Sequence, residues 1–346
     1  MSLDLALERY LPQIDAELKE CIPGPSADKA AYYGMMRYHL GWADEALQPT
    51  LQPGGKRIRP MLCLLACWAA GGDPPQALPT ACAVELVHSF SLVHDDIQDR
   101  SPTRRGRRSV WKIWGVAQAI NAGDGLFVLA RMAMHKLPER GVPLPLCQAA
   151  CQALDRACLA LCEGQYLDMT FEERPDVRLE EYLGMARRKT AALLAASAEL
   201  GAIVAGADPR RVDLYRGFGE DLGMAFQIQD DVLGIWGDPQ ATGKSAATDL
   251  RYKKKTLPVL YALDAHGNRG GDPHLRELYL RGEPLGDADV QYAIGALDRV
   301  GARQYAEEQA EAYYRRALSS LAEAGAPSQG HVCLLELAAS LLGRSA

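Results

Sequence analysis

Apolar residues recur at the spacing of an α-helix along almost the whole chain, and the alternating pattern typical of β-strands is nearly absent. Gly and Pro residues divide this pattern, and they predict one helix that runs from Pro60 to Gly71. We therefore expect an all-α fold with three polar loops, at 50–59, 171–177 and 237–256, the last of them a mobile flap. Further long helices are expected over residues 77–100, 109–137, 143–170, 178–205 and 209–236, followed by shorter ones.

Composition limits the classes of protein to which the chain can belong. Its 346 residues are 48% hydrophobic, and no linker or internal repeat divides them, so we predict a single domain spanning 1–346. A net charge of −6 argues against a nucleic-acid partner. The charged, amphipathic N-terminus predicts no signal peptide, and the apolar runs are too short to predict an integral membrane segment.

The chain contains nine cysteines, an odd number, and no export signal, which predicts reduced thiols and a cytoplasmic location. Several cysteines recur one helical turn apart, as Cys63 and Cys67 do, so zinc binding is an alternative. Because no C-x-x-C pattern is present, we interpret them as small apolar residues at helix interfaces.

Two acidic clusters lie far apart in the chain, each inside an apolar, helix-like run. In the first, Asp95, Asp96 and Asp99 project from one turn of a helix. Asp230 and Asp231 do the same on a second helix. Two facing clusters would repel unless a cation lay between them, and Mg²⁺ takes carboxylate oxygens when it also holds substrate phosphates. The clusters therefore predict a metal-dependent enzyme that acts on diphosphates.

Two basic motifs are candidates for binding the phosphates. In GGKRIRP, the glycines let the backbone approach a ligand, and Pro60 predicts that Lys56 and Arg59 lie on an extended loop before a helix. Helix N-termini favour anions through free N–H groups and the helix dipole. Arg104 and Arg105 follow the first acidic cluster, and guanidinium groups bind phosphate in a bidentate fashion. Alone, each motif would also suit a solvated basic surface.

The remaining candidates are weaker when taken one at a time. Lys189, Lys244 and Lys254 would each alone be ordinary surface lysines. His88, two helical turns before Asp95, would alone be an ordinary core histidine. The sequence has no evident Ser/His/Asp or Cys/His nucleophile arrangement, and nothing in it resembles a P-loop or a Rossmann fingerprint.

Taken in order, the motifs GGKRIRP, ELVHSFSLVHDDIQD, RRG, KT, FQIQDD, GK and KKKTLP resemble those of the trans-isoprenyl diphosphate synthases, the polyprenyl synthetase family. The resemblance covers nearly the whole chain, from Gly54 to about Pro258. It implies one polyprenyl synthetase domain, a helical bundle around a deep central cavity, usually in a homodimer. It also implies head-to-tail condensation of isopentenyl diphosphate with an allylic diphosphate, with Mg²⁺ as the cofactor and three ions per site when substrate is bound.

The resemblance assigns roles residue by residue. Asp96 and Asp231 would be close supports or further ligands of the metal. Mg²⁺ would be bound by Asp95, Asp96, Asp99, Asp230 and Asp231. The allylic diphosphate would be held by Arg104, Lys189, Thr190, Gln227, Lys244 and Lys254. The diphosphate of isopentenyl diphosphate would be held by Lys56, Arg59, His88 and Arg105. The cavity would also be lined by Gln165 and Asp168.

The chemistry of the reaction agrees with these roles. Ionising an allylic carbon–oxygen bond requires the leaving diphosphate to be neutralised, which metal ions and fixed cations do. The released diphosphate can take up the final proton, so no protein base is required. One position departs from the family pattern: Gly234 stands where an acidic residue often ends the second cluster, and Asp238 in the flap is a candidate substitute.

Product length is expected to depend on the helix that carries Asp95. Phe90 lies five residues earlier, roughly 7.5 Å along a helix axis, and the next residue, Ser91, is small. In the family, a bulky residue at the position of Phe90 resembles a floor that stops elongation. Together with a first acidic motif that has no insertion, this favours geranylgeranyl diphosphate as the product, with farnesyl diphosphate as the alternative.

Three other functions fit these motifs less well than condensation does. A class I terpene cyclase needs no second diphosphate site, so GGKRIRP and Arg105 favour condensation. A non-catalytic regulatory subunit would typically lose one acidic cluster, and both are present here. A phosphatase would need a nucleophile or a water-activating base, for which the sequence offers no candidate.

Overall fold

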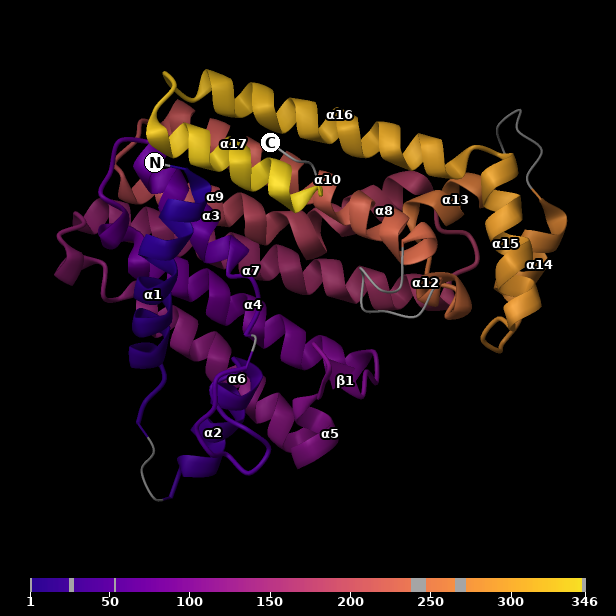
Figure 1. The fold of residues 1–346 in the computed structure, drawn as a ribbon, viewed down its shortest axis with the longest axis horizontal. Helices are drawn as coiled ribbons and strands as arrows, with labels where there is room; N and C mark the ends of the chain where they lie inside the picture. The colour runs from indigo at the N-terminus through magenta and orange to yellow at the C-terminus, as the bar shows by residue number, and fades with distance from the viewer. Residues whose placement is uncertain (1, 25–27, 53, 238–246, 265–271, 344–346) are drawn as a thin grey trace. The chain divides into compact units, whose positions relative to one another are not determined.

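The structure is a computed structural model that describes residues 2–24, 28–52, 54–237, 247–264 and 272–343 (Figure 1). Its regular elements in these ranges are helices, apart from one two-stranded hairpin, so the predicted all-α fold is confirmed. The chain packs as two compact units, each built from three separated segments. Unit 1 comprises Met1–Arg156, Ala196–Arg216 and Ala324–Leu337, and unit 2 comprises Ala157–Ala195, Gly217–Glu323 and Ala338–Ala346.

Unit 1 is built around α3 and α4, whose side chains are largely buried. A helix that is apolar on all sides belongs inside a protein, and α3 is of this kind. Figure 1 shows α4 and α6 side by side, with the hairpin beyond the end of α4. The elements are α1 (Leu3–Cys21), α2 (Ala30–His39), α3 (Ile58–Ala69), η1 (Pro74–Ala77), α4 (Leu78–Gln98), β1 (Thr103–Arg104), β2 (Arg107–Arg108), α5 (Val110–Trp114), α6 (Val116–Met134), η2 (Pro138–Arg140) and most of α17 (Gln329–Leu341).

Unit 2 contains two apolar clusters, one around α8 and α13 and the other around α14 and α15. Its own elements are α8 (Leu179–Ala186), the π-helical turn η3 (Arg187–Ala191), α12 (Thr248–Arg251), α13 (Leu257–Leu263), α14 (Pro273–Leu280), α15 (Asp287–Arg299) and α16 (Ala302–Glu323). Four of the described helices contribute residues to both units: α7 (Leu144–Glu173), α9 (Ala192–Val204), α10 (Pro209–Trp236) and α17. None of the described helices is long and apolar enough to cross a lipid bilayer.

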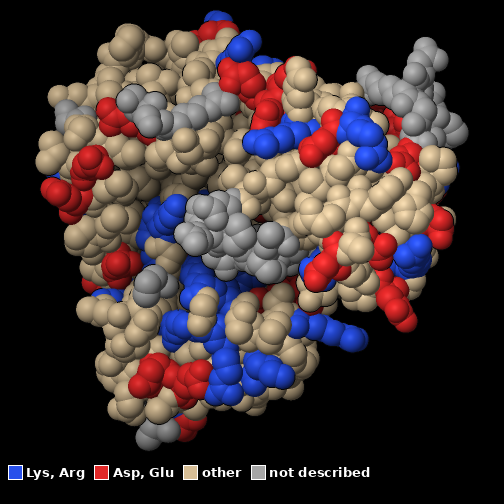
Figure 2. All heavy atoms as spheres, turned by 45° about the vertical axis from the view of Figure 1, so that its right-hand side comes forward, with Lys and Arg blue, Asp and Glu red and all other residues tan. Residues whose placement is uncertain are grey.

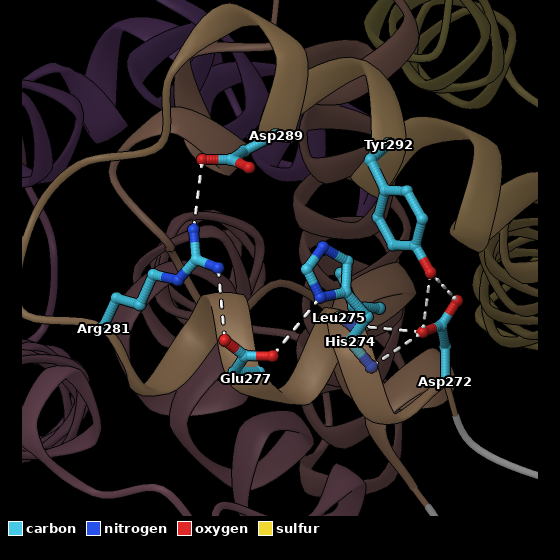
Figure 3. Close-up of polar contacts among 7 residues, drawn as sticks. All are labelled: Asp272, His274, Leu275, Glu277, Arg281, Asp289 and Tyr292. Carbon is cyan, nitrogen blue, oxygen red and sulfur yellow. Dashed lines mark hydrogen bonds and ion pairs between the residues drawn. The ribbon is translucent and has the colours of Figure 1, made fainter.

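A polar network holds α14 against α15 (Figure 3). Asp272 caps α14 by accepting hydrogen bonds from the backbone N–H groups of His274, at 3.0 Å, and Leu275, at 3.1 Å. The same carboxylate accepts a hydrogen bond from Tyr292 Oη on α15 at 2.9 Å. At the other end of α14, Arg281 pairs with Glu277 at 3.2 Å. One residue, Asp272, therefore starts a helix and joins it to its neighbour.

The helix predicted over 109–137 is two helices. It breaks at Gly115, whose φ of 84° is a conformation that L side chains rarely adopt. The short α5 lies before the break, and α6 begins directly after it. Apolar spacing continues across this glycine, so periodicity alone does not reveal the break.

The prediction for the GGKRIRP loop was wrong at its C-terminal end. Helix α3 starts at Ile58, so Arg59 lies in its first turn and not on an extended segment. The residue that leaves the helical region is Arg57, the N-cap, with a φ of 50°. Pro60 is tolerated in the first turn because the N–H groups there have no partner within the helix.

Two other predicted loops contain helical residues. Helix α7 continues to Glu173, inside the loop predicted over 171–177. In the predicted flap, α12 forms at Thr248–Arg251, and residues 238–246 lie outside the described part of the chain. The β1–β2 hairpin was not predicted, because strands of two residues are too short for an alternating pattern.

Candidate active site

The first acidic cluster lies at the C-terminal end of α4, in unit 1. Asp95 is half-buried, Asp99 is the exposed C-cap residue, and Asp96 is only 1% exposed. Arg104 Nε donates a hydrogen bond to Asp96 Oδ1 at 2.8 Å. Burial raises the pKa of Asp96 to about 6, against the opposing effect of Arg104. Asp96 therefore joins the helix end to β1, while the other two carboxylates stay accessible.

The hairpin after α4 directs Arg105 toward the GGKRIRP loop. Arg105 and Gly106 form the two-residue turn, with φ angles of 53° and 74°, which matches the turn with two positive φ angles that suits the twist of paired strands. Arg105 Nη1 donates a hydrogen bond to the carbonyl oxygen of Gly54. The motifs RRG and GGKRIRP, about fifty residues apart in the sequence, thus meet in unit 1.

All four residues predicted to hold isopentenyl diphosphate lie at this loop. Arg59 Nη1 is 3.2 Å from His88 Nε2, which places α3 and α4 in direct polar contact. Burial, and next the charges of Arg59 and Arg105, keep the pKa of His88 well below its usual range, so the ring is neutral at pH 7. Lys56 lies on the exposed part of the loop.

Arg57, in the same motif, has a structural role. Its side chain is 6% exposed and pairs with the buried Glu85 at 2.6 Å. It also donates to the carbonyl oxygen of Gly54 at 3.1 Å and contacts Asp15 at 3.3 Å. The loop is therefore shaped by one buried arginine, and other cations remain at the surface. Figure 2 shows Lys and Arg side chains gathered in the lower part of the face that it presents.

In unit 2, Asp231 and Asp230 have different environments. Asp231 is 2% exposed and accepts hydrogen bonds from Tyr182 Oη, from Gln227 Nε2 at 3.0 Å and from the backbone N–H of Leu257 at 3.0 Å. Burial raises the pKa of Asp231 to about 6, although these donors oppose the shift. Asp230, one residue earlier on α10, is exposed. Asp231 is thus held in a buried place by three donors, and Asp230 is the accessible carboxylate.

A π-helical turn presents the KT motif. Lys189 Nζ pairs with Asp168 Oδ2 of α7 at 2.5 Å, and Thr190 Oγ1 donates to Gln227 Oε1 of α10 at 2.6 Å. Single π turns often occur at functional sites in helices. Gly164 on α7 packs against the backbone of this turn, where any added Cβ would overlap the Lys189 backbone. Through these contacts, the turn brings Lys189 and Thr190 to Asp168 and Gln227, respectively.

Lys254 lies near the same carboxylates. Burial by itself would lower the pKa of Lys254, yet this pKa lies above its ordinary value because four carboxylates interact with the ammonium group. They belong to Asp168, Asp249, Asp231 and Asp230. Within unit 2 the structure therefore brings together Lys189, Thr190, Gln227, Lys254 and both aspartates of the second cluster. Lys244, also predicted here, lies outside the described residues.

The missing acidic side chain at position 234 has a neighbour that could fill its place. The carboxylate of Asp249, on α12, packs against Gly234, where an added Cβ would overlap Oδ2. The candidate proposed from sequence, Asp238, lies outside the described residues. In the sequence, Asp249 is one of several charged residues in a predicted polar loop. Its distance from Gly234 along the chain gives no sign that the two are in contact.

The donors that could hold a metal ion are all carboxylate oxygens, which suits Mg²⁺. In the described ranges, no three His, Cys, Asp or Glu side chains are grouped closely enough to hold an ion by themselves. Asp95, Asp99 and Asp230 are the accessible members of the predicted set.

Comparison with known proteins agrees with this arrangement. The family model described as polyprenyl synthetase matches residues 41–297. The chain is 42% identical over 315 residues to the (2E,6E)-farnesyl diphosphate synthase of Mycobacterium tuberculosis, covering 90% of this chain and 86% of the relative. It is 39% identical over 290 residues to the geranylgeranyl diphosphate synthase of the same organism, covering 84% and 81%. A polyprenyl synthetase from Streptomyces coelicolor has a TM-score of 0.87 at 34% identity, with 98% of each chain covered.

The all-α fold, the two acidic clusters with their basic neighbours, and these matches define the class: the chain is a prenyltransferase. It belongs to the polyprenyl synthetase family. The resemblance predicted from the motifs, to short-chain trans-isoprenyl diphosphate synthases, is therefore confirmed.

Proposed function

We propose that this protein catalyses the Mg²⁺-dependent, head-to-tail condensation of isopentenyl diphosphate with allylic diphosphates. The observation that carries the proposal lies in unit 1, where Arg59, His88 and Arg105 gather around the GGKRIRP loop in addition to the Asp96–Arg104 pair. A second cationic group suits a second diphosphate, which condensation requires and cyclisation does not. Geranylgeranyl diphosphate is our preferred product and farnesyl diphosphate the alternative, and relatives of both names support a short-chain product.

Each group of residues then has a distinct part in the reaction. Lys56, Arg59, His88 and Arg105 would bind and orient the diphosphate of isopentenyl diphosphate. Arg104, Lys189, Thr190, Gln227, Lys244 and Lys254 would hold the allylic diphosphate. Asp95, Asp99 and Asp230 would hold Mg²⁺, which supplies charge neutralisation to the leaving diphosphate when bound. Asp96 and Asp231 keep their neighbours in place through the contacts described above. The final proton would go to the released diphosphate.

The direct test is product analysis of the purified protein. It is incubated with Mg²⁺, isopentenyl diphosphate and each of dimethylallyl, geranyl and farnesyl diphosphate separately, and the dephosphorylated products are identified by mass. We expect a dominant twenty-carbon alcohol and no product after Mg²⁺ is removed by chelation. A dominant fifteen-carbon alcohol would show that the product is farnesyl diphosphate and not geranylgeranyl diphosphate. Absence of condensation with every starter, from folded protein, would overturn the proposed function.

A homodimer is the second part of the proposal, and an exposed apolar stripe on α6 supports it. The stripe consists of Val116, Ile120, Val128 and Met132, which follow one another along this helix and are 47%, 41%, 54% and 57% exposed. We expect light scattering to give twice the 37.7 kDa chain mass for the wild type. The double variant Val128→Glu/Met132→Glu should give one chain mass, and the control Leu280→Glu, at an exposed leucine of α14, should stay dimeric. An unchanged mass for the double variant would exclude this stripe as the interface.

We place the protein in the cytoplasm. None of the nine cysteines, all of which the structure describes, forms a disulfide, and burial raises the pKa of Cys63 to about 12, as expected of an inert core thiol. Cysteines without disulfides in a chain of this size suit a reducing compartment.

A further inference from the structure

The predicted floor residue Phe90 does not stand alone in unit 1. Its ring lies 5.2 Å from the ring of Phe127 on α6, at an interplanar angle of 52°. It also lies 4.9 Å from the imidazole of His94, one turn later on α4, in an edge-on contact at 70°. Both distances are within the range of favourable aromatic pairs. Three rings from two helices therefore form one contiguous cluster.

The backbones of α4 and α6 come close together beside this cluster. Gly123 lies directly against the imidazole of His94, and an added Cβ there would overlap the ring. His94 Nε2 is 3.3 Å from the carbonyl oxygen of Ile120, which holds the imidazole against α6. On the other side of α6, Gly125 packs against Tyr32 and Met36 of α2 in the same way. Phe127 is thus presented from a helix that is in close contact with a neighbour on each side.

The cluster lies where α4 changes from buried to accessible. Every residue from 78 to 87 is buried, whereas Phe90, His94 and Phe127 are each half-buried. Half-buried rings retain a surface that a ligand can contact, and two phenylalanines cover much more apolar area than one. The first acidic residue, Asp95, follows His94 directly on the same helix.

We infer that Phe127 is a second determinant of product length, forming with Phe90 a two-ring floor under the growing prenyl chain. The inference rests on the proposed function and adds to it a residue on a different helix. A ring supported only from its own helix can rotate away from an advancing chain. Here the ring of Phe127 packs against Phe90 across the α4–α6 interface, so extension beyond the floor requires both rings to give way. His94 is a positioning residue that holds Phe90 between itself and α6.

Product lengths of a small variant set test this inference. Phe127→Ala should shift most of the product at least one five-carbon unit beyond the wild-type length, and Phe90→Ala should do the same. The double variant should give longer products than either single variant. Phe127→Tyr, which keeps the ring, and Leu280→Ala, at the exposed leucine of α14, should both retain the wild-type length. The rate of the first condensation, measured with dimethylallyl diphosphate, should stay within about threefold of wild type throughout.

A second substitution covers the case in which Phe127→Ala does not fold. Phe127→Trp fills the floor further and should shift the product distribution toward shorter chains. Wild-type product lengths from an active Phe127→Ala or an active Phe127→Trp variant would overturn the inference. This outcome differs from failure of the proposed function, in which the wild-type protein itself would give no condensation product with any starter.

Discussion

Replacement of Asp230 by alanine is expected to lower kcat/KM for condensation by a factor of about 10²–10³ while leaving the unfolding midpoint unchanged. Asp230 is exposed on α10, so its removal leaves no buried group without a partner. The loss would come from weaker neutralisation of the leaving diphosphate. Steady-state kinetics with a circular-dichroism melt measure both quantities. Titration calorimetry should also show weaker Mg²⁺-dependent binding of a non-cleavable allylic diphosphate analogue.

The adjacent residue supplies the matched control. Asp231→Ala removes the acceptor of Tyr182 Oη, Gln227 Nε2 and the Leu257 N–H in a buried place, so it should reduce the free energy of unfolding by about 1–3 kcal/mol. The two variants should therefore differ. Asp230→Ala should lower only kcat/KM, whereas Asp231→Ala should also lower the free energy of unfolding. Wild-type kcat/KM in Asp230→Ala would remove this residue from the metal site.

Replacement of Glu85 by alanine should give the largest loss of stability, about 3–5 kcal/mol in the free energy of unfolding. Arg57 is 6% exposed and Glu85 side-chain exposure is 4%, so the variant would leave a guanidinium charge inside the protein without its carboxylate. Arg57 is also the left-handed N-cap residue that starts α3, so the loop carrying Lys56 and Arg59 should loosen. Urea denaturation followed by circular dichroism measures the change.

Two further substitutions separate charge from packing at this pair. Glu85→Gln keeps the side-chain shape and an acceptor oxygen, so it should lose less stability than Glu85→Ala. Asp15, the other carboxylate on Arg57, is 42% exposed, and Asp15→Ala should change the free energy of unfolding by about 1 kcal/mol or less. If Glu85→Ala were no more destabilising than Asp15→Ala, the buried pair would not be what holds the loop.

The features that could be predicted from the sequence are those that depend on local order along the chain. The long helices follow from apolar spacing, and α7 and α10 begin within one residue of the predicted positions. The acidic clusters and basic motifs could be recognised because helical spacing places their members on one face. The predicted roles of Lys189 and Lys254 remain predictions, but the structure pairs Lys189 with Asp168 and places Lys254 near Asp168 and the second acidic cluster.

What was missed depends on contacts between distant residues. Glu85 lies among apolar residues on α4, and only its contact with Arg57 explains a carboxylate there. Tyr182 is separated from Asp231 by 49 residues, and Phe127 is 37 residues after Phe90. The contact of Asp249 with Gly234 depends on how α12 folds back on α10. Composition and spacing carry no information about such pairs.

The π-helical turn at Arg187–Ala191 sets how this part of the chain can change in length. Helices α8 and α9 run on from either side of it, so the turn carries a surplus residue within one continuous helical run. Deleting one residue within the turn would restore regular α-helical counting, so α8 and α9 would keep about the same orientation relative to each other. The residues of the turn itself would change direction, and with them Lys189 and Thr190, which now contact Asp168 and Gln227. A deletion elsewhere in α9 would instead rotate the helical residues that follow it by about 100°, because the surplus residue of the turn lies before it.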